Sequence, residues 1–143
     1  MEDVTAGFIG FGLIGGSIAR ALKLRFDNTN IIAFNYYKDR TNTSLEMALE
    51  DGTIDCISTD LAEDFCQCDI IFLCCPVLTN IQYLQKLKNI VKPTCIITDV
   101  GSVKGNIHEA VHALNMDAQF IGGHPMAGSE KTGYTNSSAI ILE

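Results

Sequence analysis

The stretch Gly10-Phe11-Gly12-Leu13-Ile14-Gly15 carries the strongest structural signal in this chain. It follows a short apolar run at residues 4–9, and it leads into residues 13–26, whose apolar positions have helical spacing. A strand, a G-x-G-x-x-G turn and a helix in this order are typical of a βαβ unit that binds a dinucleotide. A glycine-rich turn needed only for packing is the simpler alternative.

Each glycine of this turn has a physical role in such a unit. Gly10 permits the tight turn, Gly12 lets the backbone approach a pyrophosphate, and Gly15 lets the helix and the strand pack closely. The N-terminus of the helix then directs its partial positive charge at the phosphates. We therefore predict a dinucleotide site that is formed by Gly10, Phe11, Gly12, Leu13, Ile14 and Gly15.

Short apolar runs alternate with longer amphipathic stretches along the rest of the chain. This alternation predicts an α/β fold of the Rossmann type, with a doubly wound, mainly parallel sheet and helices on both faces. The apolar run at residues 139–143 predicts the start of one more strand. The other predicted strands are residues 4–9, 30–34, 56–58, 70–74, 95–98 and 119–121. The predicted helices are residues 13–26, 61–66, 78–91 and 103–114, and a short one that the Thr43-x-x-Glu46 capping box opens and Gly52 stops.

The composition limits the class of protein. The chain has 143 residues, of which 47% are hydrophobic and 19% charged, and its formal net charge is −7 at pH 7. Residues 1–143 are predicted to form one dinucleotide-binding domain, and intrinsic disorder is excluded. The negative charge argues against a nucleic-acid partner. The longest apolar run, Ile70 to Leu78, is too short to span a bilayer, and no secretory signal opens the chain. We expect a cytoplasmic protein without a membrane partner.

The chain contains six cysteines. They include no C-x-x-C pair and no cluster with histidine at zinc spacing, so we predict no metal site. In a reducing cytoplasm they are expected to be free thiols that act mainly as small buried apolar residues. A redox or nucleophilic role is the alternative. The cysteines are Cys56, Cys66, Cys68, Cys74, Cys75 and Cys95.

The end of the second predicted strand bears on the choice of cofactor. An NAD site usually has Asp or Glu here to bind the ribose 2′-hydroxyl, but this chain has Asn35. A neutral amide does not repel a 2′-phosphate, and Lys38 and Arg40 follow closely enough to bind one. These residues favour NADP over NAD. In the alternative, Asn35 binds a plain ribose, and Asp39 offsets the charge of a solvated surface.

Two polar residues follow later strands. His124 lies in a glycine-rich loop after the strand predicted at 119–121, at the sheet edge where α/β proteins bind ligands, and it is a candidate general base. Ser102 is predicted to cap the helix that follows it, to supply an active-site hydroxyl, or to do both. Lys131 is a candidate for attracting an anionic substrate, and Glu130 for orienting it. Both are also compatible with ordinary loop charges.

Three motifs together resemble the prephenate dehydrogenase family, and they occur in its order and spacing. The related arogenate dehydrogenases share them. The resemblance covers essentially all of this chain but only the N-terminal, nucleotide-binding half of the family's protein. The motifs are Gly7-Phe8-Ile9-Gly10-x-Gly12-Leu13-Ile14-Gly15-Gly16-Ser17, Asp99-Val100-Gly101-Ser102-Val103-Lys104, and Gly122-Gly123-His124-Pro125-Met126-Ala127-Gly128-Ser129-Glu130-Lys131-x-Gly133.

The resemblance implies oxidative decarboxylation of prephenate to 4-hydroxyphenylpyruvate in tyrosine biosynthesis, with hydride transfer to NAD or NADP. It implies that His124 accepts the substrate's hydroxyl proton. Ser102 matches a serine that hydrogen-bonds this histidine and contacts the nicotinamide side. Glu130 matches an acid that helps to shape the entrance. Cys75 and Pro76, after the predicted strand at 70–74, complete with Ser102 the expected cofactor-binding residues.

The chain departs from the family pattern in two ways. Asn35 stands in place of the expected acid, and the helical C-terminal half is absent. In the family, that half forms the homodimer and supplies an arginine for the substrate carboxylates, so we expect this chain to bind nucleotide but to be nearly inactive. Two alternatives remain open. One is another Rossmann oxidoreductase, which residues 122–133 argue against, and the other is a nucleotide-sensing module without catalysis.

Overall fold

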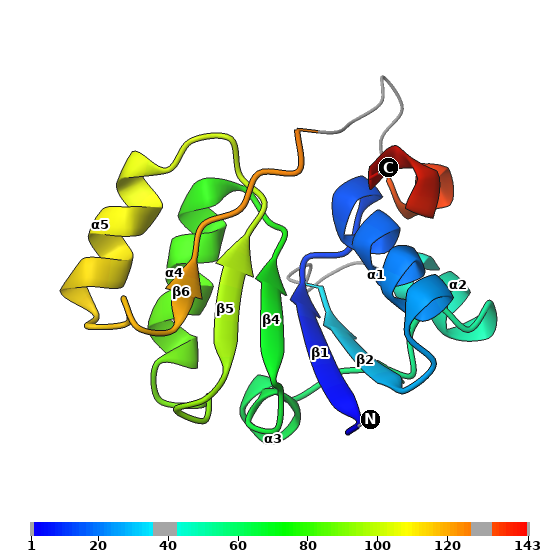
Figure 1. Cartoon of the computed structure of the whole chain (residues 1–143), viewed down its shortest axis with the longest axis horizontal. Helices are drawn as coiled ribbons and strands as arrows, with labels where there is room; N and C mark the ends of the chain where they lie inside the picture. Colours follow the sequence, from blue (N-terminus) through cyan, green and yellow to red (C-terminus); the bar gives the residue numbers. More distant parts are fainter. Residues whose placement is uncertain (1, 36–42, 127–132, 143) are drawn as a thin grey trace.

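The computed structural model describes residues 2–35, 43–126 and 133–142 (Figure 1). Its centre is a six-stranded sheet in the order β3-β2-β1-β4-β5-β6, in which every neighbouring pair is parallel. The strands are β1 (Val4–Ile9), β2 (Thr29–Phe34), β3 (Cys56–Ile57), β4 (Ile70–Leu73), β5 (Ile96–Asp99) and β6 (Phe120–Ile121). The helices are α1 (Leu13–Arg25), α2 (Thr43–Glu50), α3 (Leu61–Phe65), α4 (Val77–Leu87) and α5 (Gly105–Ala113), with short 3-10 helices η1 (Tyr134–Asn136) and η2 (Ala139–Leu142).

Buried side chains form two separate cores, one on each face of the sheet. Alternate residues of a strand point to opposite faces, so Phe8 of β1 enters one core and Ile9 the other. The Phe8 core lies under α1 and α2, and the Ile9 core lies under α3, α4 and α5. Figure 1 shows α1 and α2 beside β1 and β2, and α4 and α5 beside β5 and β6. The prediction of a doubly wound α/β fold is confirmed.

The strand order reverses direction at β1, and this places the glycine-rich turn. β1 lies between β2 and β4, and the chain leaves its carboxyl end between these two neighbours. The Gly10 N–H donates to the Phe34 carbonyl at 2.9 Å, and the Cys74 N–H donates to the Ile9 carbonyl at 2.8 Å. In open α/β sheets, ligands bind in the crevice at such a reversal. The predicted dinucleotide turn therefore occupies the position that the topology favours.

Two predicted elements differ in the structure. The strand expected at residues 139–143 is the 3-10 helix η2, which lies against α1 instead of joining the sheet. A short apolar run does not distinguish a strand from a helical turn, and packing decided the outcome here. The helix expected from residue 103 begins at Gly105, with Lys104 as its N-cap residue, so Ser102 does not cap it. None of the helices in the described ranges has the length and apolarity to cross a bilayer.

The C-terminal described segment, residues 133–142, packs against α1, and its Tyr134 joins the buried core on that face of the sheet. The Tyr134 hydroxyl donates to the Asp51 carboxylate at 2.6 Å, and the Arg20 guanidinium lies 4.6 Å from the centre of the Tyr134 ring. The Ser138 N–H donates to the Ser17 hydroxyl at 3.0 Å. A Cβ on Gly16 would lie 2.7 Å from the Tyr134 ring, so the absence of a side chain at Gly16 permits this contact.

Candidate active site

The three glycines of the motif have different surroundings. Gly10 has a φ of +85°, which favours glycine, and a Cβ there would lie 2.7 Å from the Cys75 sulfur. A Cβ on Gly15 would lie 3.0 Å from the Gly10 carbonyl oxygen. A Cβ on Gly12 would meet nothing within 4 Å. The outer two glycines are therefore required by packing, and Gly12 leaves an open approach to the backbone.

The start of α1 fits an anionic ligand. Its first turn contains no acidic residue, and Gly12 precedes it as the N-cap residue without a side chain to occupy the free N–H groups. These features fit a pyrophosphate at the N-terminus of α1. Leu13 and Ile14 are half-buried. Phe11 is buried and its ring stacks on Tyr134 with centroids 5.2 Å apart, so only the Phe11 backbone can face a nucleotide.

The turn after β4 forms the second wall of the crevice. Cys75 is buried beside Gly10, and its thiol donates to the Ile9 carbonyl at 3.4 Å. Burial raises the pKa of the Cys75 thiol to about 12, so it stays protonated and does not act as a nucleophile. Pro76 is exposed and precedes α4.

Asn80 is a positioning residue in this wall that the sequence pattern did not single out. It is completely buried in α4, and its side-chain carbonyl accepts the Cys75 N–H at 2.9 Å. Its amide donates to the Leu73 carbonyl at 3.3 Å. These two bonds fix the turn that carries the expected cofactor contacts at Cys75 and Pro76. The available signal was a polar residue within an otherwise apolar helical face, four residues after Pro76.

His124 opens onto a pocket of about 260 Å³ at the same sheet edge. Its side chain is exposed to solvent. The pocket brings His124 together with residues of α1, β4 and β5, although these are far apart in the sequence. A neutral imidazole in such a position can accept a proton from a bound hydroxyl group. The lining residues are Ile18, Phe72, Thr98, Asp99, Val100, Gly123, His124 and Pro125.

Ser102 is exposed and lies outside the residues that line this pocket. In the described part of the chain no hydrogen bond joins it to His124, so the bond that the family resemblance implies is not formed in this structure. Asn35 follows β2 next to the glycine-rich turn, as predicted. Four further predicted site residues, Lys38, Arg40, Glu130 and Lys131, lie outside the described residues.

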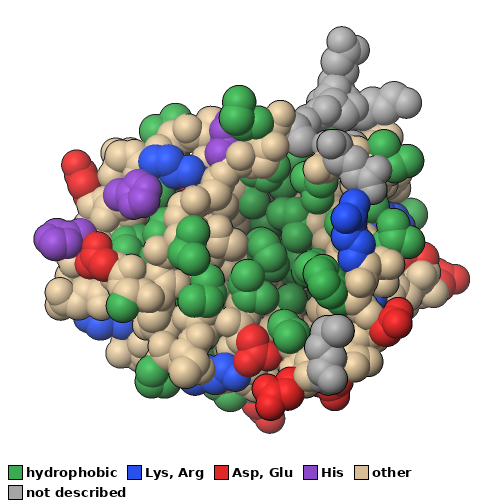
Figure 2. Space-filling view, viewed as in Figure 1, with side chains coloured by type: hydrophobic (Ala, Val, Ile, Leu, Met, Phe, Trp, Pro, Cys, Tyr) green, Lys and Arg blue, Asp and Glu red, His purple; other side chains and the backbone are tan. Residues whose placement is uncertain are grey.

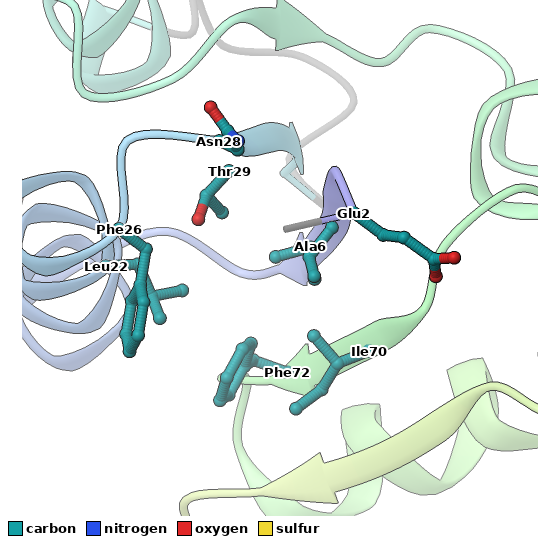
Figure 3. Close-up of a pocket in the computed structure, with 9 residues that line it drawn as sticks. Glu2, Ala6, Leu22, Phe26, Asn28, Thr29, Ile70 and Phe72 are labelled. Atoms are coloured by element: carbon teal, nitrogen blue, oxygen red, sulfur yellow. The ribbon is translucent and has the colours of Figure 1, made fainter.

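A second hollow, of about 220 Å³, has different chemistry. Figure 3 shows Leu22 of α1 and Phe26, the residue that follows this helix, facing Ala6 of β1 and the side chains of β4. Figure 2 shows apolar side chains gathered in the middle of this face of the molecule, with most charged groups around them. The lining is almost entirely apolar and contains none of the predicted nucleotide contacts, so this hollow is not the nucleotide site.

The cysteines are free, as predicted. Cys68, Cys75 and Cys95 are buried, whereas Cys66 is exposed. Burial raises the pKa of Cys68 to about 12 and that of Cys95 to about 11, which disfavours a reactive thiolate at either position. Within residues 2–35, 43–126 and 133–142, no group of three or more His, Cys, Asp or Glu side chains is arranged to hold a metal ion.

The strand order, the glycine-rich turn and the pocket at one sheet edge define a dinucleotide-binding domain of the dehydrogenase type. Comparison with known proteins narrows this class. Residues 18–143 match the family model described as "Prephenate dehydrogenase, nucleotide-binding domain". The chain belongs to this family.

Individual relatives agree with this assignment. The chain is 32% identical over 145 residues to the prephenate dehydrogenase of Bacillus subtilis (strain 168), a match that covers 100% of this chain and 38% of that protein. It matches the crystal structure of prephenate dehydrogenase from Aquifex aeolicus in complex with hydroxyphenyl propionate and NAD+ with a TM-score of 0.86 and 32% identity, over 100% of this chain and 49% of that one. It matches Synechocystis arogenate dehydrogenase with a TM-score of 0.81 and 36% identity, over 94% of this chain and 45% of that one. The chain thus spans less than half the length of each of these relatives.

Proposed function

We propose that this chain is the cofactor-binding part of an NAD(P)-dependent dehydrogenase that converts prephenate to 4-hydroxyphenylpyruvate and carbon dioxide. The observation that carries the proposal is the pocket that His124 shares with Ile18 of α1. It lies at the same sheet edge as the glycine-rich turn, so a nucleotide held at the start of α1 can extend toward His124. Family membership and the named relatives support the same reaction.

The chain's residues have distinct tasks in this reaction. The backbone around Gly12 and the N-terminus of α1 bind the pyrophosphate. When bound, a nicotinamide ring supplies the acceptor for the hydride that leaves the hydroxyl-bearing ring carbon of the substrate. His124 accepts the proton of that hydroxyl as carbonyl character develops. Loss of carbon dioxide then leaves an aromatic ring, and this drives the reaction. Ser102 is proposed to contact the nicotinamide side, and Glu130 and Lys131 to shape the substrate entrance.

Arogenate is the second candidate substrate, because the chain is 36% identical to Synechocystis arogenate dehydrogenase. For the cofactor we propose a preference for NADP, supported by the neutral Asn35 and by Lys38 and Arg40 close behind it. NAD is the alternative, and it is the nucleotide in the A. aeolicus complex. A cytoplasmic location and a homodimer formed through a further domain belong to the same proposal.

Calorimetric titration of the chain with NADP and with NAD tests the cofactor proposal. We expect tighter binding of NADP, and Arg40→Ala should weaken NADP at least about tenfold while leaving NAD unchanged, because it removes one charge-assisted phosphate contact. Lys88→Ala, on an exposed residue after α4, is the control and should change neither affinity. Tighter binding of NAD would overturn the NADP preference alone. If a folded chain bound neither nucleotide, the proposed cofactor role would be wrong.

Product analysis tests the reaction. Long incubation of the chain with prephenate and cofactor should give a small amount of 4-hydroxyphenylpyruvate, and arogenate is offered in parallel. His124→Asn should lower the rate by about 10²–10⁴-fold, since general-base catalysis contributes that much. His112→Asn, on an exposed histidine of α5, is the matched control. If the chain forms measurable product and its His124→Asn variant forms it at the same rate, His124 is excluded as the base.

A further inference from the structure

A buried ion pair lies at the edge of the candidate active site. Asp99 is the last residue of β5, and its side chain is 1% exposed. The Lys104 ammonium lies 2.6 Å from Asp99 Oδ2, and the Lys104 side chain is 27% exposed. Leaving a buried carboxylate without its partner is costly, so the two charges depend on each other. The two residues lie five positions apart, on either side of the loop between β5 and α5.

The two oxygens of Asp99 hold two different loops. Oδ2 accepts the Gly101 N–H at 3.3 Å, and Oδ1 accepts the Gly123 N–H at 3.2 Å. Lys104 also donates to the Gly123 carbonyl, so both polar backbone groups of Gly123 are held by this ion pair. A Cβ on Gly123 would lie 2.7 Å from the Asp99 carbonyl oxygen, so the close approach requires glycine.

The two residues held in this way directly precede the two candidate catalytic residues. Gly101 precedes Ser102, and Gly123 precedes His124. We infer that Asp99 and Lys104 form a positioning pair that fixes the backbone at Ser102 and His124 relative to each other. The catalytic meaning of this inference rests on the proposed function, whereas the anchoring of the two loops does not.

Lys104 could instead be a direct anion-binding residue. Two of the three donors of its ammonium are already directed at Asp99 and Gly123, which favours positioning. The two roles differ in their consequences. A positioning residue changes the environment of His124 even when no ligand is bound, whereas an anion-binding residue changes the affinity for a ligand.

Nuclear magnetic resonance of the full chain tests the inference with three variants. Lys104→Met breaks the pair, and the double variant Asp99→Asn/Lys104→Met removes both charges, so it leaves no buried unpaired carboxylate if the single variant folds poorly. Lys104→Arg keeps the charge. Lys92→Met is the matched control, because Lys92 lies 2.5 Å from Asp69 in an ion pair at the opposite edge of the sheet. The measurements are amide hydrogen exchange, the His124 imidazole signals, and calorimetric NAD affinity.

The positioning role predicts a specific combination of results. Exchange of the Gly123 N–H should become at least about tenfold faster in Lys104→Met and in the double variant, and stay within about twofold in Lys92→Met. NAD affinity should stay within about twofold, because the Gly10–Gly15 turn is not altered. Addition of NAD should shift the His124 imidazole signals of the unmodified chain and of Lys104→Arg. The shift should be much smaller in Lys104→Met and in the double variant, which lack the ion pair.

The results that would contradict the positioning role differ from those that would contradict the proposed function. Unchanged exchange at Gly123 in both pair-breaking variants would overturn the positioning role, whether or not NAD binds. A large loss of NAD affinity with unchanged exchange would overturn it in favour of direct anion binding. If the unmodified, folded chain bound neither NADP nor NAD, the proposed function would fail, and with it the catalytic meaning of the pair.

Discussion

At the scale of single residues, one motif combines positions needed for folding with a position needed for binding. Gly10 has a left-handed backbone and a Cβ there would contact Cys75, whereas a Cβ on Gly12 would enter open space. The sequence pattern G-x-G-x-x-G requires glycine at both positions, so it does not show that Gly10 is needed for packing and Gly12 for access to the backbone. The structure separates them, because it shows which side of each glycine is occupied by protein.

Alanine substitutions should therefore separate folding from binding. Gly12→Ala is expected to change the free energy of unfolding by less than about 1 kcal/mol, since only an N-cap preference is affected. It should weaken nucleotide binding at least about tenfold, because the methyl group occupies the approach to the backbone. Gly10→Ala should cost ~3 kcal/mol or more through backbone strain and overlap with Cys75. Urea unfolding and calorimetry measure both effects, and equal destabilisation by the two changes would contradict the assignment.

At the scale of elements, periodicity predicted the order and type of most helices and strands. The apolar run at residues 70–74 predicted β4, and the helical spacing of apolar residues at 78–91 predicted α4. Both predictions succeeded because burial on one or both faces of an element imposes such a pattern on its apolar residues. Periodicity did not locate every boundary. The helix after Ser102 begins at Gly105, and Lys104, its N-cap residue, pairs with Asp99 at the end of β5.

The same limit applies to the candidate site. His124 and the glycine-rich turn could be placed at one edge of the sheet from the sequence, because carboxyl ends of parallel strands share an edge. Asn80 could not be assigned, since its partners are backbone groups of a turn that its own helix does not contain. Polar residues that hold backbone, such as Asn80 and Asp99, become evident only when the fold brings their partners together.

The packing of residues 133–142 on α1 gives an element-scale prediction. Gly16→Ala places a methyl group 2.7 Å from the Tyr134 ring, so the segment must shift. We expect a loss of about 1–3 kcal/mol in the free energy of unfolding, as for other overpacked sites. We also expect faster exchange of the Ser138 N–H, which donates to the neighbouring Ser17.

Gly105→Ala is the matched control for this prediction. Gly105 is also in a helix, but a Cβ there would meet nothing within 4 Å. This change should be neutral or stabilising by up to about 1 kcal/mol, since alanine favours helix more than glycine does. Equal effects of the two substitutions on unfolding would show that Gly16 is not needed for the contact with Tyr134.

At the scale of the whole molecule, carboxylates tie separate parts of the fold together. Asp69 accepts from Lys92 at 2.5 Å and from the Thr5 N–H at 2.8 Å, which joins β1 to the segment that precedes β5. The hydrogen bond from Lys92 is the main reason that the pKa of Asp69 lies below its ordinary value. Burial acts to raise the pKa of Asp51, but hydrogen bonds from Thr53 and Tyr134 outweigh it and lower that pKa.

These lowered pKa values predict how stability depends on pH. A carboxyl group with a lower pKa in the folded state stabilises the fold fully above its unfolded pKa, near 3.8 here, and loses that contribution as the pH falls through the folded pKa. The free energy of unfolding should therefore fall between about pH 5 and pH 2. Asp69→Asn should cost about 1 kcal/mol at pH 7, a small value because the group is partly solvated, and the cost should shrink below about pH 4.

Urea unfolding at several pH values measures this dependence, and Asp27→Asn serves as the control because Asp27 is exposed. The Asp69→Asn curve should be flatter between about pH 5 and pH 2 than the curves of the unmodified chain and of the control. Since Asp69 precedes β4 and contacts β1 and the segment before β5, the two neighbours of β4, its loss should lower the stability of the sheet as one cooperative unit. Parallel curves for Asp69→Asn and Asp27→Asn would show that the Asp69 contacts do not contribute to the stability of the folded chain.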